Sequence, residues 1–121
     1  RLVDAWRRVG TKIERSVAHI RRPLFFTELG YASQEGINKD PWNYFIAVDD
    51  IDLGEQRDCF AAVLEVVPTL EFVHGAFWFD YFGEGGRGDS GYTPRGKPAI
   101  ETWREWAAVE CDRGIERSAD R

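Results

Sequence analysis

Glu28 is the residue whose type and position point most directly to chemistry. It stands near the C-terminal end of residues 24–30, LFFTELG, a segment that is otherwise almost continuously apolar. Burying a carboxylate there is costly unless the group is paired or hydrogen-bonded. Such a Glu could serve as nucleophile, general base or metal ligand. It could equally emerge at a strand end and meet solvent or an Arg, and the pattern alone leaves both interpretations open.

A second candidate segment is the aromatic run FWFDYF at residues 77–82. If it is a strand, period-two alternation places Trp78, Asp80 and Phe82 on one face. The Trp78 ring could then form a flat floor for a ligand, and Asp80 could accept hydrogen bonds from ligand hydroxyls. The alternative is an aromatic core strand in which Asp80 caps a turn.

Metal and phosphate sites are poorly supported by the sequence. Its two His and two Cys residues show no short ligand spacing, so we expect no His- or Cys-based metal site. The Gly-rich segment 83–91 carries Glu84 and Asp89 against a single Arg87, and it lacks a Gly-Lys-Ser/Thr ending. We therefore expect neither phosphate binding there nor any cofactor.

Composition narrows the class of partner. The chain has 121 residues and a net charge of −5, without the clustered basic surface typical of nucleic-acid binding. It contains no apolar run of about 18 residues, so we expect no membrane span. Cys59 and Cys111 are interpreted as small, reduced core residues, with a disulfide left open. The compartment, cytoplasmic or secreted, stays unassigned.

Hydrophobic periodicity and breakers predict alternating helices and strands. The expected helices cover residues 2–20, residues 54–67 and a segment that opens at Lys97-Pro98. The expected strands cover residues 24–30 and 72–82. Between the first strand and the second helix lies a long connection, 31–53, with four aromatic residues: Tyr31, Trp42, Tyr44 and Phe45. Residues 114–121 are expected to form a polar, frayed tail.

This order predicts an α/β fold whose strands pair in parallel through right-handed crossovers. Two strands cannot close a barrel or bury both of their faces, and a complete (β/α)₈ TIM barrel needs about 250 residues. Residues 1–113 are therefore expected to be one portion of a single larger domain, incomplete on its own.

Five stretches together resemble a known family. They are Arg22–Tyr31, Asp40–Trp42, Gln56, Gly75–Asp80 and Asp89–Ala99. In order and spacing they resemble clan A glycoside hydrolases, most closely the family 113 β-mannanase-like barrels. The resemblance implies that the two strands are strands seven and eight of a (β/α)₈ barrel. The chain would then be the C-terminal portion of that barrel.

The resemblance also implies roles for individual residues. Glu28 would be the nucleophile of a retaining glycosidase, and Trp78 would lie beneath the sugar next to the scissile bond. Tyr31 and Trp42, in the loop after strand seven, would line the cleft for the substrate, an oligo- or polysaccharide. Asp80 stays a candidate substrate-binding residue from the pattern of its own segment. A retaining glycosidase needs two carboxyl groups. The acid/base Glu ends strand four in clan A, a segment absent from these 121 residues, so the chain alone is expected to be catalytically incomplete.

Three functional hypotheses follow. The first is the C-terminal portion of a retaining β-glycosidase that acts on a β-mannan or a related saccharide. The second is a non-catalytic, carbohydrate-binding barrel. The third is a structural fragment stabilised by the missing N-terminal part of the barrel or by self-association, because half a barrel exposes apolar strand edges.

Overall fold

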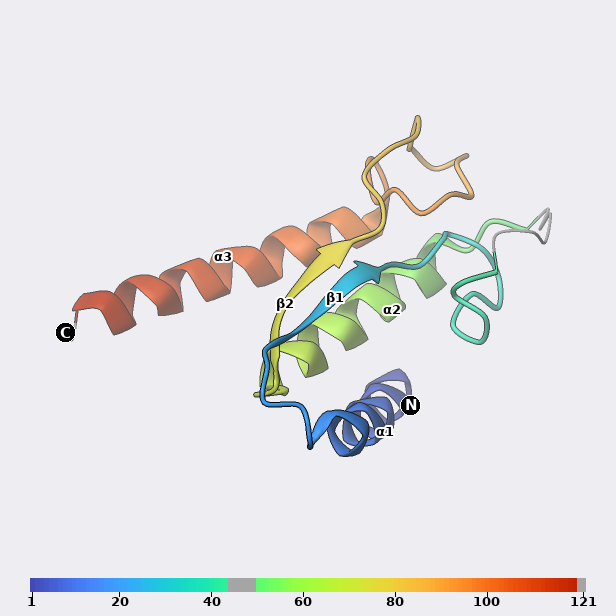
Figure 1. The fold of residues 1–121 in the computed structure, drawn as a ribbon. Helices are drawn as coiled ribbons and strands as arrows, with labels where there is room; N and C mark the ends of the chain where they lie inside the picture. Colours follow the sequence, from blue (N-terminus) through green and yellow to red (C-terminus); the bar gives the residue numbers. More distant parts are fainter. Residues whose placement is uncertain (44–49, 120–121) are drawn as a thin grey trace.

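The computed structural model describes residues 1–43 and 50–119, with side chains as far as Cys111. Tyr44 and Phe45 of the expected connection lie outside the described residues. Along the chain the elements are α1 (Leu2–Val17), β1 (Leu24–Leu29), α2 (Leu53–Val66), a short 3-10 helix η1 (Val67–Thr69), β2 (Val73–Trp78) and α3 (Pro98–Ala119). The two strands lie side by side and parallel, which confirms the predicted pairing (Figure 1).

Helix α2 is the centre of the fold. It packs on both α1 and α3 and lies behind the strand pair (Figure 1). Asp52 begins the helix as an N-cap, because its Oδ1 accepts a hydrogen bond from the backbone N–H of Glu55 at 2.7 Å. Phe60 and Val63 on α2 join Leu29 of β1 in the buried core. One face of the strand pair thus packs against α2.

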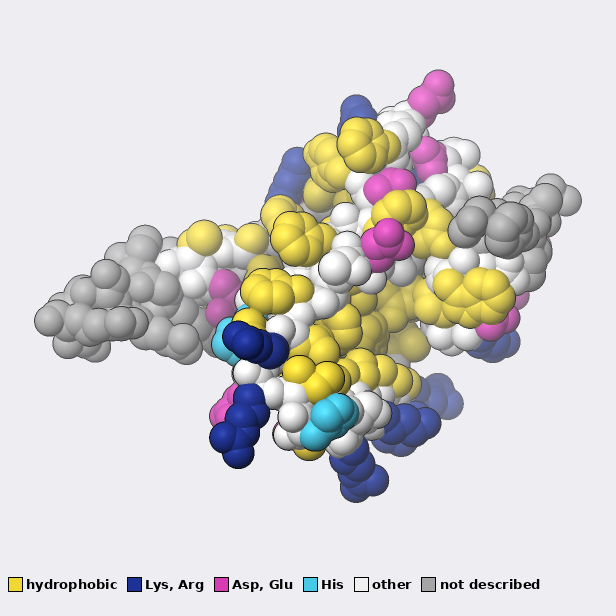
Figure 2. All heavy atoms as spheres, in the orientation of Figure 1, with side chains coloured by type: hydrophobic (Ala, Val, Ile, Leu, Met, Phe, Trp, Pro, Cys, Tyr) yellow, Lys and Arg dark blue, Asp and Glu magenta, His cyan; other side chains and the backbone are white. Residues whose placement is uncertain are grey.

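The opposite face of the strand pair is uncovered in the described part of the chain. Phe25 on β1 is 50% exposed and Phe77 on β2 is 64% exposed. Figure 2 views the molecule from this side and shows hydrophobic side chains in front of the strands. An apolar surface of this kind is unusual on a protein that functions alone, and it agrees with the expectation that two strands cannot bury both faces.

Strand β2 is shorter than predicted. It ends at Trp78, which pairs with Leu29, and Phe79 then donates its backbone N–H to the carbonyl oxygen of Leu29 at 3.0 Å. Beyond this point β1 has ended, so the run 79–82 has no strand to pair with. The expected strand 72–82 is therefore wrong at its C-terminal end.

Both outer helices also differ from the sequence prediction. Helix α1 ends at Val17 because the N–H of Ile20 bonds to the Val17 carbonyl at 2.7 Å, a tight turn that stops the helix. Helix α3 continues through Ala119, so residues 114–119 are helical where the sequence predicts a frayed tail.

The two cysteines are both reduced, but only one lies in the core. Cys59 is 1% exposed, and burial together with nearby acidic groups raises its pKa to about 12, so the thiol stays neutral. Cys111 is exposed on α3, and its predicted core position is wrong. The C-terminal part of α3 extends beyond the other elements (Figure 1).

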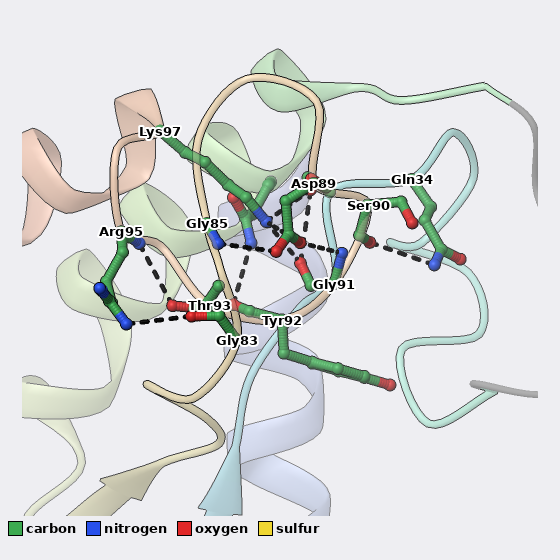
Figure 3. Close-up of polar contacts among 12 residues, drawn as sticks. Gln34, Gly83, Gly85, Asp89, Ser90, Gly91, Tyr92, Thr93, Arg95 and Lys97 are labelled. Carbon is green, nitrogen blue, oxygen red and sulfur yellow. Dashed lines mark hydrogen bonds and ion pairs between the residues drawn. The ribbon is translucent and has the colours of Figure 1, made fainter.

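The two long loops leave the same edge of the strand pair and meet at a buried lysine (Figure 3). The Nζ of Lys97 donates to Ser33 Oγ at 2.9 Å, to Asp89 Oδ1 at 3.0 Å and to the Gly91 carbonyl at 2.8 Å. Lys97 is 2% exposed and Ser33 is 0% exposed. Ser33 belongs to the loop after β1, whereas the others belong to the loop after β2, so this cluster joins the two loops.

Asp89 is a second hub in the same cluster. Its carboxylate accepts backbone N–H groups of Gly85 at 2.8 Å and Gly91 at 2.6 Å, which shapes the Gly-rich loop. Burial pushes the pKa of Asp89 upward, but the hydrogen bonds from Gly85, Lys97 and Gly91 outweigh it and hold the pKa below its usual range. Burial lowers the pKa of Lys97, and Asp89 opposes that shift.

Replacing Asp89 should destabilise the fold. Asp89→Asn leaves the Lys97 ammonium buried without its counter-ion, at an expected cost of about 2–4 kcal/mol in the free energy of unfolding. Urea denaturation at neutral pH measures the difference. The matched control is Asp58→Asn, which removes an exposed ion pair with Arg57 and should cost less than about 1 kcal/mol. Equal losses in the two variants would contradict a special role for Asp89.

The contribution of Asp89 should depend on pH. Because its pKa is lower in the folded than in the unfolded chain, the stabilisation is present above the unfolded pKa of about 4. It is lost as the pH falls through the folded-state pKa. The gap in unfolding free energy between the native protein and Asp89→Asn should therefore narrow in acid. A gap that stays constant from neutral pH to about pH 3 would contradict this.

Candidate active site

A cleft of about 620 Å³ opens at the edge where both strands end. It lies between the loop that follows β1 and the loop that follows β2. Its lining combines one carboxylate from each strand end with several aromatic rings. The lining residues are Trp6, Glu28, Leu29, Gly30, Tyr31, Pro41, Trp42, Phe79, Asp80 and Tyr92. Four of the five predicted site residues are among them.

Glu28 presents a free carboxylate to this cleft. The pairing register of β1 shifts between Phe26 and Leu29, so regular alternation does not hold there. Glu28 is exposed and lines the cleft, whereas the next residue, Leu29, is buried in the core with α2. No described residue hydrogen-bonds or ion-pairs with the Glu28 carboxylate. The alternative that Glu28 is neutralised by an Arg therefore finds no support among the described residues.

Gly30 lets the two strand ends meet beneath the cleft. A Cβ built on Gly30 would lie 1.7 Å from the carbonyl oxygen of Phe79, so no other residue fits without moving the backbone. Glu28 precedes this contact on one chain segment, and Asp80 follows it on the other. The close approach therefore brings both carboxylates into the lining of one cleft.

Tyr31 is held rigidly at both its ends. Its hydroxyl accepts a hydrogen bond from Trp6 Nε1 at 3.0 Å, and its carbonyl accepts one from Gln56 Nε2 at 2.8 Å. Burial raises the pKa of Tyr31 to about 12, so the hydroxyl stays protonated. The ring is only 8% exposed. Tyr31 therefore contributes shape to the cleft wall more than a reactive group.

Gln56 ties the two loops together from below. This fully buried side chain donates to the Tyr31 carbonyl and also to the Tyr92 carbonyl, at 3.1 Å. Its Oε1 has no hydrogen-bond partner among the described residues. One buried amide on α2 thus sets the separation of two segments that line the cleft.

Trp42 and Tyr92 also line the cleft. Trp42 is 68% exposed, in the loop after β1. Tyr92 comes from the loop after β2, packs edge-on against Phe79 with ring centroids 5.3 Å apart, and donates its hydroxyl to the Pro41 carbonyl at 2.7 Å. The predicted site residues include neither Tyr92 nor Phe79. Tyr92 does lie in the matched stretch Asp89–Ala99, which was the available signal.

Trp78 lies away from this cleft. Its ring stacks on Phe60 of α2 at 4.4 Å, with an interplanar angle of 15°, on the helix side of the sheet. The expected shared face of Trp78, Asp80 and Phe82 fails because β2 ends at Trp78 and the alternation stops there. Asp80 lines the cleft, whereas Phe82 is 85% exposed.

No three His, Cys, Asp or Glu side chains of the described residues are grouped so that they could hold a metal ion. In the same part of the chain, none of the helices has the length and apolar character that a membrane crossing requires.

Solved structures with the same fold come from mannanases. Two structures of a GH113 β-1,4-mannanase, one of them a complex, superpose with TM-scores of 0.75 at 25% and 26% identity. Each comparison covers 86% of this chain and 35% of the other. The GH113 β-mannanase AaManA from Alicyclobacillus acidocaldarius, in complex with ManMIm, gives 0.72 at 26% identity over 88% of this chain and 36% of that one. This chain therefore spans about a third of the length of these proteins.

The comparison with protein families agrees with these structures. No curated protein sequence matches the chain significantly. The sequence profile of Glycoside Hydrolase Family 113, however, matches residues 1–97. Family members are (β/α)₈ barrels, and the two parallel strands with their helices form a fragment of that fold. Most of the chain is covered by this match, and the chain belongs to glycoside hydrolase family 113.

Proposed function

We propose that this chain is the C-terminal part of a retaining β-glycosidase that acts on a β-mannan or a related β-linked saccharide. The observation that carries the proposal is the carboxylate of Glu28, unpaired among the described residues and facing a cleft lined by aromatic rings. In (β/α)₈ enzymes the active site lies at the C-terminal ends of the strands, and Glu28 stands one residue before the end of β1.

The order of the matched stretches supports β1 and β2 as strands seven and eight of the barrel. The uncovered apolar face of the strand pair would then line the barrel interior and pack on preceding strands. In this proposal the partner of the face is an N-terminal barrel portion outside these 121 residues. That portion would also supply the preceding strand at the free edge of β1.

Glu28 would act as the nucleophile in a double displacement. Its carboxylate attacks the anomeric carbon and forms a glycosyl-enzyme intermediate, while a second carboxyl group protonates the leaving oxygen and then activates water. The two groups must lie about 5–5.5 Å apart. The clan A resemblance places the second group on strand four, so the chain by itself would lack the acid/base.

Sugar binding would fall to the rest of the cleft lining. Asp80 offers an acceptor for sugar hydroxyls, Trp42 offers an exposed ring, and Tyr31 shapes the wall. The predicted position of Trp78 beneath the sugar gains no support from its stacking on Phe60. Phe79 supplies an aromatic ring at the corresponding strand end inside the cleft.

Removing the nucleophile should abolish turnover. In the longer protein that carries this chain, Glu28→Ala should lower kcat on β-manno-oligosaccharides by about four or more orders of magnitude, since the covalent step disappears. Adding azide should restore cleavage of an activated aryl glycoside and release a glycosyl azide of inverted anomeric configuration. Glu84→Gln, an exposed loop carboxylate outside the cleft lining, is the control and should keep the native rate. A native rate in Glu28→Ala would remove Glu28 from this role.

Adding a side chain at Gly30 should also impair catalysis. Gly30→Ala would force the Phe79 carbonyl away from β1 and shift Glu28 relative to Asp80. A displacement of about 1 Å can cost about a hundredfold in rate, so we expect a loss of that order in kcat. Gly88→Ala is the matched control because nothing lies within 4 Å of its added Cβ. Circular dichroism checks folding of both variants, and a folded Gly30→Ala enzyme with native kcat would contradict the argument.

A further inference from the structure

We propose that Tyr92 is a positioning residue that holds Trp42 as the platform of an outer sugar-binding subsite, and so sets the preference for longer saccharides. The inference rests on the proposed function and deepens it. It concerns two residues that lie 50 positions apart in the sequence and come from different loops. They come close to each other because the loop after β1 meets the loop after β2.

The first step is that Tyr92 itself is immobilised. Its carbonyl oxygen accepts a hydrogen bond from the buried side-chain amide of Gln56, and its ring packs edge-on against Phe79. The neighbouring Gly91 carbonyl is held by Lys97 Nζ at 2.8 Å. In Figure 3 the Tyr92 side chain points away from the Lys97 cluster. These contacts fix the position of the Tyr92 hydroxyl.

The second step is what this hydroxyl holds. It donates to the Pro41 carbonyl at 2.7 Å, within a turn closed by the Asn43 N–H on the Asp40 carbonyl at 3.0 Å. Pro41 and Trp42 are the two central residues of that turn, and Pro is favoured at the first of these positions. The Tyr92 bond therefore anchors the turn that carries Trp42.

The third step is the chemistry that this wall would recognise. Trp42 is 68% exposed but lines the same cleft as Glu28 and Asp80. An exposed flat ring that lines the same cleft as a carboxylate fits a pyranose that stacks its apolar C–H face while its hydroxyls reach polar groups. Because Trp42 is far more exposed than Tyr31 in the same cleft lining, it is assigned to a sugar next to the one whose bond is cleaved.

This arrangement separates binding from chemistry. Tyr92→Phe keeps the ring that packs on Phe79 and removes the hydroxyl that donates to the Pro41 carbonyl. In the longer protein, we expect KM for a long β-manno-oligosaccharide to rise about five- to tenfold with kcat unchanged, while a short substrate that does not reach Trp42 is unaffected. Trp42→Ala should give the same pattern. The double variant should add little to either single one, because both act on one contact.

Tyr81→Phe is the matched control. Tyr81 is 60% exposed, and its ring lies under Arg95 outside the lining of the Glu28 cleft. Removing the Tyr81 hydroxyl should change neither KM nor kcat for the long or the short substrate. An equal effect of Tyr92→Phe on short and long substrates, or no effect on either, would overturn the subsite.

A second measurement needs no substrate. Lys39 is exposed and precedes the anchored turn, so trypsin should cut after Lys39 faster in Tyr92→Phe than in the native protein or in Tyr81→Phe. Unchanged cleavage would overturn the role of Tyr92 and leave the proposed function intact. If the native protein neither cleaves nor binds β-linked manno-oligosaccharides, the proposed function and the subsite both fall, whereas faster cleavage at Lys39 would still establish the Tyr92 anchor.

Discussion

A buried ammonium is the constraint on which the rest of the structure depends. Lys97 has no access to water, so its charge must be met by protein oxygens. It finds them on Ser33, Asp89 and Gly91, which belong to the two loops at the carboxyl edge of the strands. Since Lys97 immediately precedes α3, the same cluster also fixes where that helix begins. The hydrogen bonds of Lys97 therefore hold together the two loops that line the cleft.

Two further contacts, at Gly30 and at Gln56, shape the candidate site. The absence of a side chain at Gly30 lets the Phe79 carbonyl approach, and the amide of Gln56 binds the backbones of Tyr31 and Tyr92. Together they place the carboxylate of Glu28 among aromatic rings. The uncovered face of the two strands is the face that, under the proposed function, would line the barrel interior.

Much of the fold was predictable from local signals. The period-3.6 stripes, Pro98 and the apolar run around Glu28 located the helices and the first strand to within a few residues. The parallel pairing followed from their alternation. The end of β2 was not predictable, because FWFDYF reads as one continuous strand. It ends at Trp78 because its neighbour β1 ends at Leu29, the residue with which Trp78 pairs.

Some features of the candidate site were likewise predictable from the sequence, and others were not. The sequence by itself determined that Glu28 is an unusual carboxylate at a strand end and, through the order of its motifs, which family the chain resembles. Tertiary structure alone decided that Trp78 faces Phe60 and not the cleft, and that Tyr92 stands beside Pro41. The physical reason is that a side chain's direction beyond a strand end depends on long-range hydrogen bonds and packing, such as those of Lys97 and Gln56. No local pattern encodes these contacts.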